Sequence, residues 1–221
     1  MSKNPFPVAA LANAFFSFLR EALSPSSCAA CDTLIGPQRV FCPTCAVSVT
    51  RASSNEPEQL AFASFGGAIA VAIRRFKYEE RPELGRPLGH LLRRLLREEA
   101  VHADVVVPVP LHPKRLAERG YNQAALLAAA ASEELRVPLL ARALRRERDT
   151  SQQARLGKTE RLTNVSGAFV VRDPSSIAGK DVLLVDDVLT TGATLSACRE
   201  ALLLAQAKSV VTVCLARAGA E

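Results

Sequence analysis

The sequence predicts an α/β fold built on a doubly wound, mainly parallel sheet, with a small cysteine-rich module on its N-terminal side. Short apolar runs rich in β-branched residues alternate with helical patterns along the second half of the chain. The runs lie at 104–108, 182–185 and 210–215, and the helical patterns lie at 86–99, 124–135 and 194–205. Strands that are apolar on both faces and alternate with helices are typical of a parallel sheet. Four cysteines cluster ahead of these units, within residues 28–45.

Length and composition are consistent with that prediction. The 221 residues are 48% hydrophobic, which is enough for one large domain with a small appendage. The formal net charge is +6, with a pI of about 9.2. Such a balance suits an anionic ligand, and phosphate, nucleic acid and acidic membrane all qualify.

The first 24 residues are expected to form an amphipathic helix. Residues 8–19 are apolar but too short to span a membrane, and no signal-cleavage pattern follows them. One face of this helix carries Leu11, Phe15, Phe18 and Leu19. No other segment approaches transmembrane length, so we expect a cytoplasmic protein without a transmembrane segment.

The cysteine spacing predicts a structural zinc ribbon over residues 25–50. Cys28 and Cys31 form one C-x2-C pair, and Cys42 and Cys45 form a second pair ten residues later. Two such knuckles supply four thiolates for a closed tetrahedral site, for which zinc is the usual occupant. Disulfides, a redox pair and an iron–sulfur cluster are the alternatives. The two other cysteines lie in apolar runs and are expected to be buried.

A polar stretch at 49–58 reads as a linker to a main unit over residues 60–221. Residues 61–65 suggest its first strand. Residues 68–76 suggest a short helix or a second strand. The Lys77–Tyr78 pair that follows favours a solvated charged end, with a place near the ligand pocket as the alternative.

Two aspartates stand at the end of the predicted strand 182–185, where a parallel sheet binds its ligands. Asp186 and Asp187 precede a turn of small and hydroxyl residues that leads into a helix: Thr190, Thr191, Gly192, Ala193 and Thr194. Backbone N–H groups of such a turn cradle a phosphate. The carboxylates suit hydroxyls, a cation or a developing positive charge, so a phosphorylated sugar meets every demand. The alternative is structural: these aspartates and threonines could serve only to cap the following helix.

Two further segments are basic. A loop after the strand 104–108 carries Lys114, Arg115, Arg119 and Gly120, and is expected to hold a second anionic group. Residues 142–161 hold seven basic and three acidic residues, among them Arg148. The same segment contains Gly157-Lys158-Thr159, but Gln152 stands where a P-loop requires glycine.

Four stretches together resemble a known family. VLLVDDVLTTGATL (182–195) resembles the phosphoribosyl diphosphate (PRPP) loop of type I phosphoribosyltransferases. VPVPLHPKRLAERGYNQAALLA (107–128), RERDTSQQARLGKTERLTNVSGAF (146–169) and the four-cysteine ribbon extend the resemblance to the ComF family, which is associated with DNA uptake in natural competence.

The resemblance implies roles for these residues. Asp186 and Asp187 would hold the ribose hydroxyls of PRPP, with Mg²⁺ bridging ribose and diphosphate. Arg115 and Arg119 would stabilise the departing diphosphate, assisted by Lys114 and Gly120. Arg148 would belong to a loop that closes over the ligand, and the turn at 190–194 would bind the phosphate.

Three interpretations stay open on the sequence alone. The chain is a PRPP-dependent transferase whose acceptor the sequence does not identify, or it binds PRPP or a nucleotide without catalysis and serves DNA uptake through a competence-machinery protein. In the third, it binds single-stranded DNA through the ribbon and the basic loop.

Overall fold

The structure is a computed structural model that describes residues 26–53, 56–147 and 168–219. The helix predicted within residues 1–24 lies outside the described residues. So do Arg148 and the Gly157-Lys158-Thr159 triplet.

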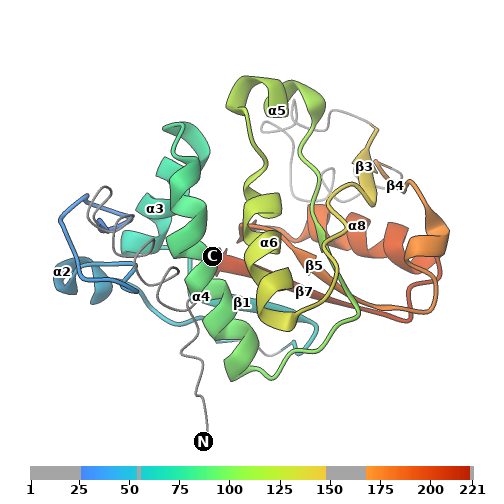
Figure 1. Ribbon diagram of the computed structural model, residues 1–221, viewed down its shortest axis with the longest axis horizontal. Coiled ribbons are helices and arrows are strands. Elements are labelled where there is room, and N and C mark those ends of the chain that lie inside the picture. The colour runs from blue at the N-terminus through green and yellow to red at the C-terminus, as the bar shows by residue number, and fades with distance from the viewer. Residues whose placement is uncertain (1–25, 54–55, 148–167, 220–221) are drawn as a thin grey trace, which may run out of the picture.

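A parallel sheet forms the centre of the molecule (Figure 1). Its strands run in the order β1-β7-β5-β2, and a short strand, β6, pairs with the end of β7. These strands are β1 (Gln59–Ser64), β2 (Val105–Pro108), β5 (Asp181–Val185), β6 (Val188–Leu189) and β7 (Ser209–Arg217). Every pairing among them is parallel, which confirms the predicted sheet.

Helices cover both faces of the sheet. They are α3 (Gly67–Tyr78), α4 (Gly85–Glu98), α5 (Pro113–Arg119), α6 (Gln123–Leu135) and α8 (Ala193–Leu204). Alternate residues of β5 enter two different cores, since Leu183 packs with α3, α4 and α6 while Leu184 packs with α8. Five leucines at helical spacing within the predicted helix at 86–99 are all buried: Leu88, Leu91, Leu92, Leu95 and Leu96. The alternation of faces confirms the doubly wound arrangement.

Some short elements are not evident from the sequence pattern. Helix α5 has only seven residues. The strands β3 (Leu144–Arg146) and β4 (Phe169–Val171) pair antiparallel as a separate two-stranded sheet. Two 3₁₀ turns, η1 (Pro82–Leu84) and η3 (Pro174–Ser176), complete the described elements. All of them are shorter than the windows over which periodicity can be read.

The cysteine-rich module shares the core of the main unit. Cys28, Ala29, Phe41 and Cys42 are buried in the same cluster as α3 and α4. A four-residue helix, α2 (Pro43–Ala46), begins at the second cysteine pair. The module is therefore a part of the same packed body, although its sequence boundaries stay a prediction.

The segment expected to be a polar linker is held in place at Arg51. Arg51 forms an antiparallel bridge with Ala63, and its guanidinium lies 4.1 Å above the ring of Phe62. It also forms an ion pair with Glu98 of α4 at 2.5 Å. At this residue the polar sequence reflects surface pairing rather than a free tether.

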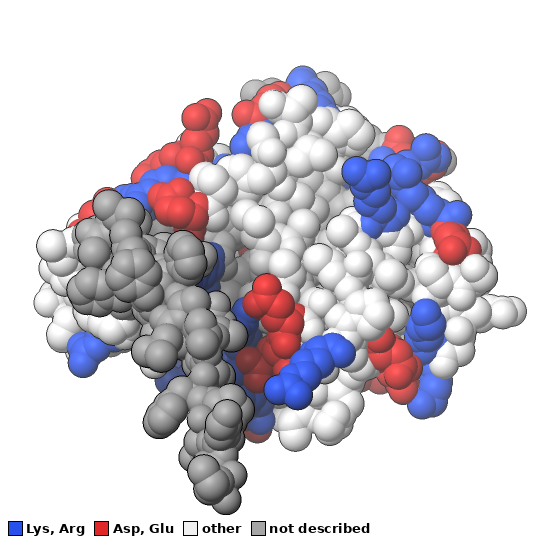
Figure 2. All heavy atoms as spheres, in the orientation of Figure 1, with Lys and Arg blue, Asp and Glu red and all other residues white. Residues whose placement is uncertain are grey.

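Charged side chains gather in neighbouring groups of both signs over a largely uncharged surface (Figure 2). Two ion pairs join α4 to α6 among the described residues, Arg93 with Glu133 and Arg97 with Glu134 at 2.7 Å. No helix among the described residues has the length and apolar character that crossing a membrane requires.

Candidate functional site

A cleft of about 500 Å³ opens at the carboxyl ends of the parallel strands. Its walls come from three strand-to-helix connections, after β1, β2 and β5. Six of the predicted site residues line it together: Arg115, Arg119, Asp186, Asp187, Thr190 and Thr194. Residues that are about 70 positions apart in the chain therefore meet where an open α/β sheet binds its ligands.

The sheet fixes the backbone of the two aspartates. Asp186 follows the last residue of β5, and its N–H donates to the carbonyl of Val213 at 3.0 Å. The N–H of Asp187 donates to Oδ1 of Asp186 at 2.8 Å, and its own carbonyl accepts from Leu215 at 3.1 Å. Both carboxylates are thus held at the sheet edge rather than on a loose loop.

Lys77 forms an ion pair with the second aspartate. Its Nζ lies 2.8 Å from Oδ1 of Asp187, whose side chain is only 9% exposed. The expectation of a solvated end for Lys77 was wrong, whereas Tyr78 beside it is indeed exposed. The helical spacing of Ile73 and Lys77, four residues apart, could have placed both on one face, and both line the cleft.

Asp186 is partly buried beside a second carboxylate, and both conditions raise its affinity for a proton. Burial, followed by the charge of Asp187, raises the pKa of Asp186 from 3.8 to about 7, while Lys77 opposes the increase. The ligand-free cleft therefore favours a proton or a cation beside Asp186 near neutral pH.

The predicted phosphate turn has the expected backbone. Gly192 has φ +78° and is the N-cap of α8, which begins at Ala193. A Cβ at this position would meet only an ordinary contact, 3.5 Å from Leu189, so the positive φ is what requires glycine. Thr190 and Thr194 line the cleft, and Thr191 is exposed next to them. The first N–H groups of α8 thus lie beside the two aspartates.

The basic loop after β2 folds into α5. Its N-cap is His112, whose Nδ1 accepts from the N–H of Lys114 at 3.3 Å. Gly120 ends the helix with φ +78°. Lys114 is exposed and Gly120 serves as a C-cap, so among the four basic-loop residues predicted to contact ligand, only Arg115 and Arg119 line the cleft.

Arg119 is oriented by two neighbours. Its Nη1 donates to Oε1 of Gln123 at 2.7 Å, and its guanidinium lies 5.3 Å from the ring centre of Tyr78. Neither neighbour carries a negative charge. Within the described parts of the chain, Arg119 forms no ion pair, although Glu80 and Glu118 line a neighbouring hollow with it.

Some residues that line the cleft were not predicted from the sequence to do so. Arg146 of β3 reaches it from the antiparallel pair, Arg74 comes from α3, and Phe65 follows β1. Charge composition alone gave no reason to select these positions from among 28 lysines and arginines.

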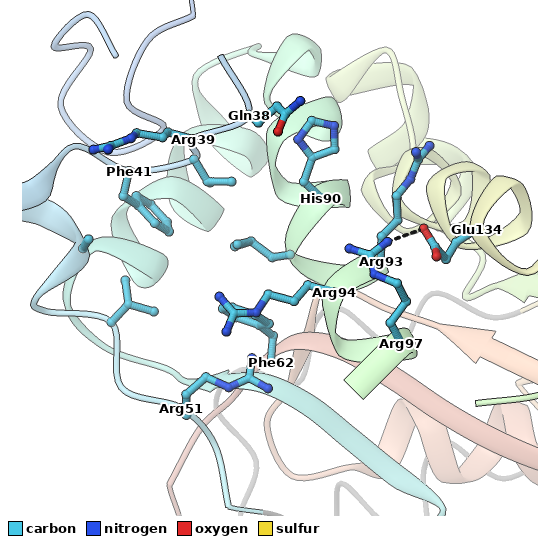
Figure 3. A pocket seen from close by; sticks show the side chains of 14 residues that line it. Gln38, Arg39, Phe41, Arg51, Phe62, His90, Arg93, Arg94, Arg97 and Glu134 are labelled. Carbon is cyan, nitrogen blue, oxygen red and sulfur yellow. Dashed lines mark hydrogen bonds and ion pairs between the residues drawn. The ribbon is translucent and has the colours of Figure 1, made fainter. Parts of the chain in front are cut away.

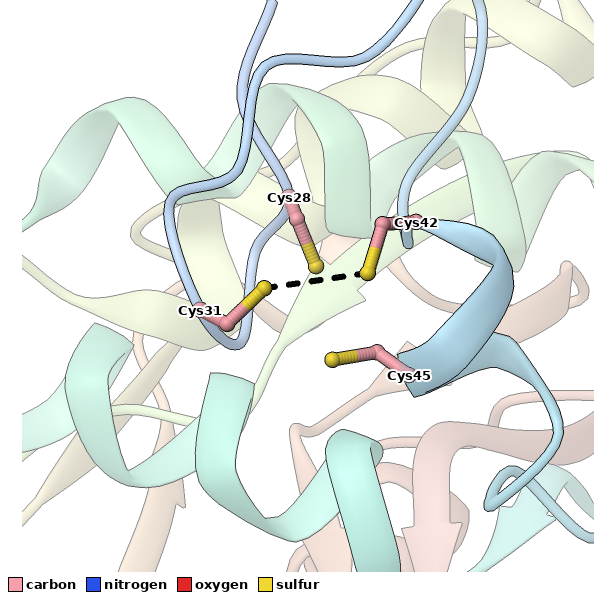
Figure 4. Close-up of side chains that lie close together, drawn as sticks. All are labelled: Cys28, Cys31, Cys42 and Cys45. Carbon is pink, nitrogen blue, oxygen red and sulfur yellow. Dashed lines mark hydrogen bonds between the residues drawn. The ribbon is translucent and has the colours of Figure 1, made fainter.

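The four clustered cysteines form a second site (Figure 4). Their sulfur atoms all lie within 4.8 Å of one another, and Cys31 and Cys42 are 3.7 Å apart. That separation is far longer than a disulfide bond, and all four thiols are free. The residues are therefore positioned to bind one metal ion.

Electrostatics within the cluster favour a cation. Hydrogen bonds from Thr33 lower the pKa of Cys31 to about 6, whereas hydrogen bonds with Cys31 and Cys42 raise that of Cys45 to about 12. Four adjacent thiolates repel one another unless a positive ion lies between them. The two remaining cysteines, Cys198 and Cys214, are buried as predicted, and burial raises the pKa of Cys214 to about 12.

Comparison with known proteins identifies similar chains. The family model described as "Phosphoribosyl transferase domain" matches residues 77–221, more than half of the chain. "DNA utilization protein YhgH" of Escherichia coli O157:H7 is 29% identical over 209 residues, covering 86% of this chain and 89% of that one. "Competence protein F" of Haemophilus influenzae is 34% identical over 134 residues, covering 58% of each chain.

Among solved structures, a glutamine phosphoribosylpyrophosphate amidotransferase from B. subtilis matches with a TM-score of 0.45 and 22% identity. The match covers 63% of this chain and 30% of that chain.

Proposed function

The chain belongs to the phosphoribosyl transferase domain family, as a ComF-type member with a four-cysteine cluster, and we propose that it binds PRPP with Mg²⁺ in the cleft at the sheet edge. One observation carries the proposal. The acid pair, the glycine turn at the start of α8 and two arginines converge on a single cleft of suitable size.

Each part of PRPP finds a chemical counterpart there. The phosphate suits the N–H groups of the Thr190–Thr194 turn, because the start of a helix attracts anions. The ribose hydroxyls suit Asp186 and Asp187. The diphosphate suits Arg115 and Arg119, since guanidinium groups match phosphate oxygens in a bidentate manner.

The donor set also fits Mg²⁺. Magnesium prefers carboxylate and phosphate oxygens, and Asp186 offers a carboxylate whose pKa is raised to about 7 by burial and a like charge. Asp186 would hold the ion together with oxygens of the ligand. When bound, the ion neutralises charge on the diphosphate, and a cation beside Asp186 keeps that carboxylate ionised.

If the chain transfers ribosyl phosphate, its residues act by electrostatics. The two carboxylates stabilise the positive charge that develops on the ribose, and Arg115 and Arg119 stabilise the leaving diphosphate. The acceptor attacks the anomeric carbon directly, so the proposal requires no covalent nucleophile from the protein.

Titration calorimetry of PRPP into the zinc-loaded protein, with and without Mg²⁺, tests the proposal. We expect saturable binding that Mg²⁺ strengthens and that Asp186→Asn/Asp187→Asn abolishes. A matched control is Asp181→Asn, a half-buried aspartate at the opposite end of β5, which should bind as the wild type does. Absence of binding by the folded wild type contradicts the proposal. Diphosphate release in an acceptor screen then distinguishes a transferase from a binding protein.

We further propose that the metal of the four-cysteine cluster is zinc in a structural role. All four ligands come from the protein, which leaves no position open for substrate. Metal analysis should find one zinc per chain, reduced in Cys31→Ser/Cys45→Ser. An iron–sulfur chromophore in freshly purified protein would contradict this assignment.

The names of the relatives suggest a cellular context. Two of them refer to competence and DNA utilization. We propose that this chain also serves DNA uptake, through contacts with a protein of the competence machinery. Deletion of its gene should reduce transformation frequency, and restoration by Asp186→Asn/Asp187→Asn would place the function outside the cleft.

A second candidate function, binding of single-stranded DNA, is supported by a basic groove between the cysteine module and α4 (Figure 3). The groove has a volume of about 910 Å³, and five arginines line it: Arg39, Arg51, Arg93, Arg94 and Arg97. Burial and then the nearby charges of Arg93, Arg86 and Arg97 lower the pKa of His90, which indicates a positive potential there.

Acidic neighbours reduce that potential. Glu98 forms ion pairs with Arg51 and Arg94, and Glu134 forms one with Arg97. Fluorescence anisotropy of a labelled oligothymidine measures the remainder: Arg39→Ala/Arg94→Ala should weaken binding and lower its salt dependence by about two phosphate contacts. Affinity that is unchanged in this variant would remove the groove from consideration.

A further inference from the structure

We propose that the cysteine module is a positioning element of the PRPP site: its two knuckles hold both ends of α3, and α3 in turn holds Lys77 against Asp187. The proposal rests on the function proposed above for its binding readout, but the mechanical part can be tested without ligand.

The second knuckle holds the start of α3. Ser48 follows Cys45 closely, and its Oγ donates to the carbonyl of Cys45 at 2.8 Å and accepts from the N–H of Ala68 at 2.9 Å. The backbones approach so closely here that a Cβ on Gly67 would lie 2.2 Å from the carbonyl oxygen of Ser48. Gly67 also has φ +49°, so both space and conformation require glycine.

The first knuckle holds the other end. Asp32, next to Cys31, forms an ion pair with Arg75 of α3 and a second one with Arg81, at 2.8 Å, just beyond the helix. Arg75 also donates to the carbonyl of Ala29 at 3.3 Å. The side chain of Arg75 is only 11% exposed, whereas that of Asp32 is 50% exposed, so the ion pair is shielded on its helix side.

Arg75 and Lys77 connect two sites through one turn of helix. Residues two apart on a helix point in nearly opposite directions, so Arg75 faces the knuckle while Lys77 faces the cleft. Between the two clamps, Ile69, Ile73 and Phe76 are fully buried and fix the position of α3 on the sheet.

Lys77 matters to an anionic ligand in two ways. Its ammonium neutralises Asp187, which would otherwise repel a phosphorylated sugar, and it adds a positive charge to the cleft. When the ion pairs of Asp32 with Arg75 and Arg81 are removed, the last turn of α3 becomes more mobile, and the charge of Lys77 is no longer held in place.

The decisive variant is Asp32→Asn. Asp32 has φ +60°, a conformation that asparagine adopts readily, so the substitution removes the ion pairs and keeps the backbone. The matched control is Glu79→Gln. It removes a carboxylate 3.1 Å from the same Arg75, but Glu79 is the C-cap of α3 itself, so no contact with the cysteine module is lost.

We expect Asp32→Asn to keep one zinc per chain and to weaken PRPP–Mg²⁺ binding in calorimetry by roughly fivefold, whereas Glu79→Gln stays within about twofold. Asp32→Asn added to Lys77→Met should then weaken binding by less than about twofold further, because Asp32 acts through Lys77. Full additivity of the two substitutions, or wild-type affinity in Asp32→Asn, overturns the proposal.

Hydrogen exchange separates this proposal from the proposed function. In ligand-free protein, Asp32→Asn should speed amide exchange in the last turn of α3, and Glu79→Gln should speed it less. If the wild type binds no PRPP, the function proposed above fails, but the exchange difference still tests whether Asp32 holds the C-terminal end of α3. Should Asp32→Asn lose zinc, Arg75→Gln tests the same contact from the helix side, and unchanged exchange in that variant overturns the clamp.

Discussion

Replacing Asp186 by asparagine should make the ligand-free protein more stable, although it should abolish ligand binding. Asp186 has a pKa of about 7 in the folded chain, against an ordinary value of 3.8. The folded state therefore keeps a proton between these pH values that the unfolded chain has released. Stability falls as pH rises through this window, and the loss is complete above pH 7.

The magnitude follows from the width of that window. About three pH units at about 1.4 kcal/mol each give a penalty of roughly 4 kcal/mol above pH 7. Asparagine has nearly the same shape, still accepts the hydrogen bond from Asp187 and cannot ionise. The advantage of Asp186→Asn should be near zero at pH 4, about half complete at pH 5.5 and full at pH 8.

Urea unfolding in Mg²⁺-free buffer at these three pH values provides the measurement. Asp181→Asn is the control with the opposite sign, because Lys208 and then Ser209 lower the pKa of Asp181 in the folded chain, so its loss should destabilise at neutral pH. A lower stability of Asp186→Asn than of wild type at pH 8, or a difference that does not vary with pH, would refute the reasoning.

Three other perturbations have expected outcomes. Gly67→Ala should lower the free energy of unfolding by at least about 2 kcal/mol in urea denaturation, because its Cβ would overlap the carbonyl of Ser48 at a positive φ; a neutral effect would contradict the close approach. Gly192→Ala should cost about 1 kcal/mol and weaken PRPP binding in calorimetry, since alanine disfavours φ +78° while its Cβ would make only an ordinary contact with Leu189. Zinc removal by a chelator should lower the melting temperature of the whole domain, still in a single transition, because the knuckles share a core with α3. An unchanged melting curve would show that the metal is dispensable for stability.

The central strands and the acid pair could be predicted because their signals are local. Four apolar residues followed by two aspartates indicate a buried strand and its carboxyl end. The same short segment contains Gly192, whose positive φ begins α8. The parallel register then brings the loop after β2 to the same edge without further information.

The role of α3 could not be predicted in the same way. Lys77 lies 110 residues from Asp187 in the sequence, and a lysine in a run of charged residues is usually solvated. The docking of the cysteine module is also non-local, because it depends on Asp32 meeting Arg75 and Arg81 across two elements. Spacing predicted the four-cysteine cluster, but only the packed structure shows that its two knuckles contact α3, which lines the cleft.

A crystal structure of the zinc-loaded protein soaked with PRPP and Mg²⁺ tests the central claim most directly. The account predicts density in the cleft, with the phosphate at the Thr190–Thr194 turn, the ribose hydroxyls at Asp186 and Asp187, and the diphosphate toward Arg115 and Arg119. An empty cleft at saturating ligand, or PRPP bound only among the arginines between the cysteine module and α4, would contradict it.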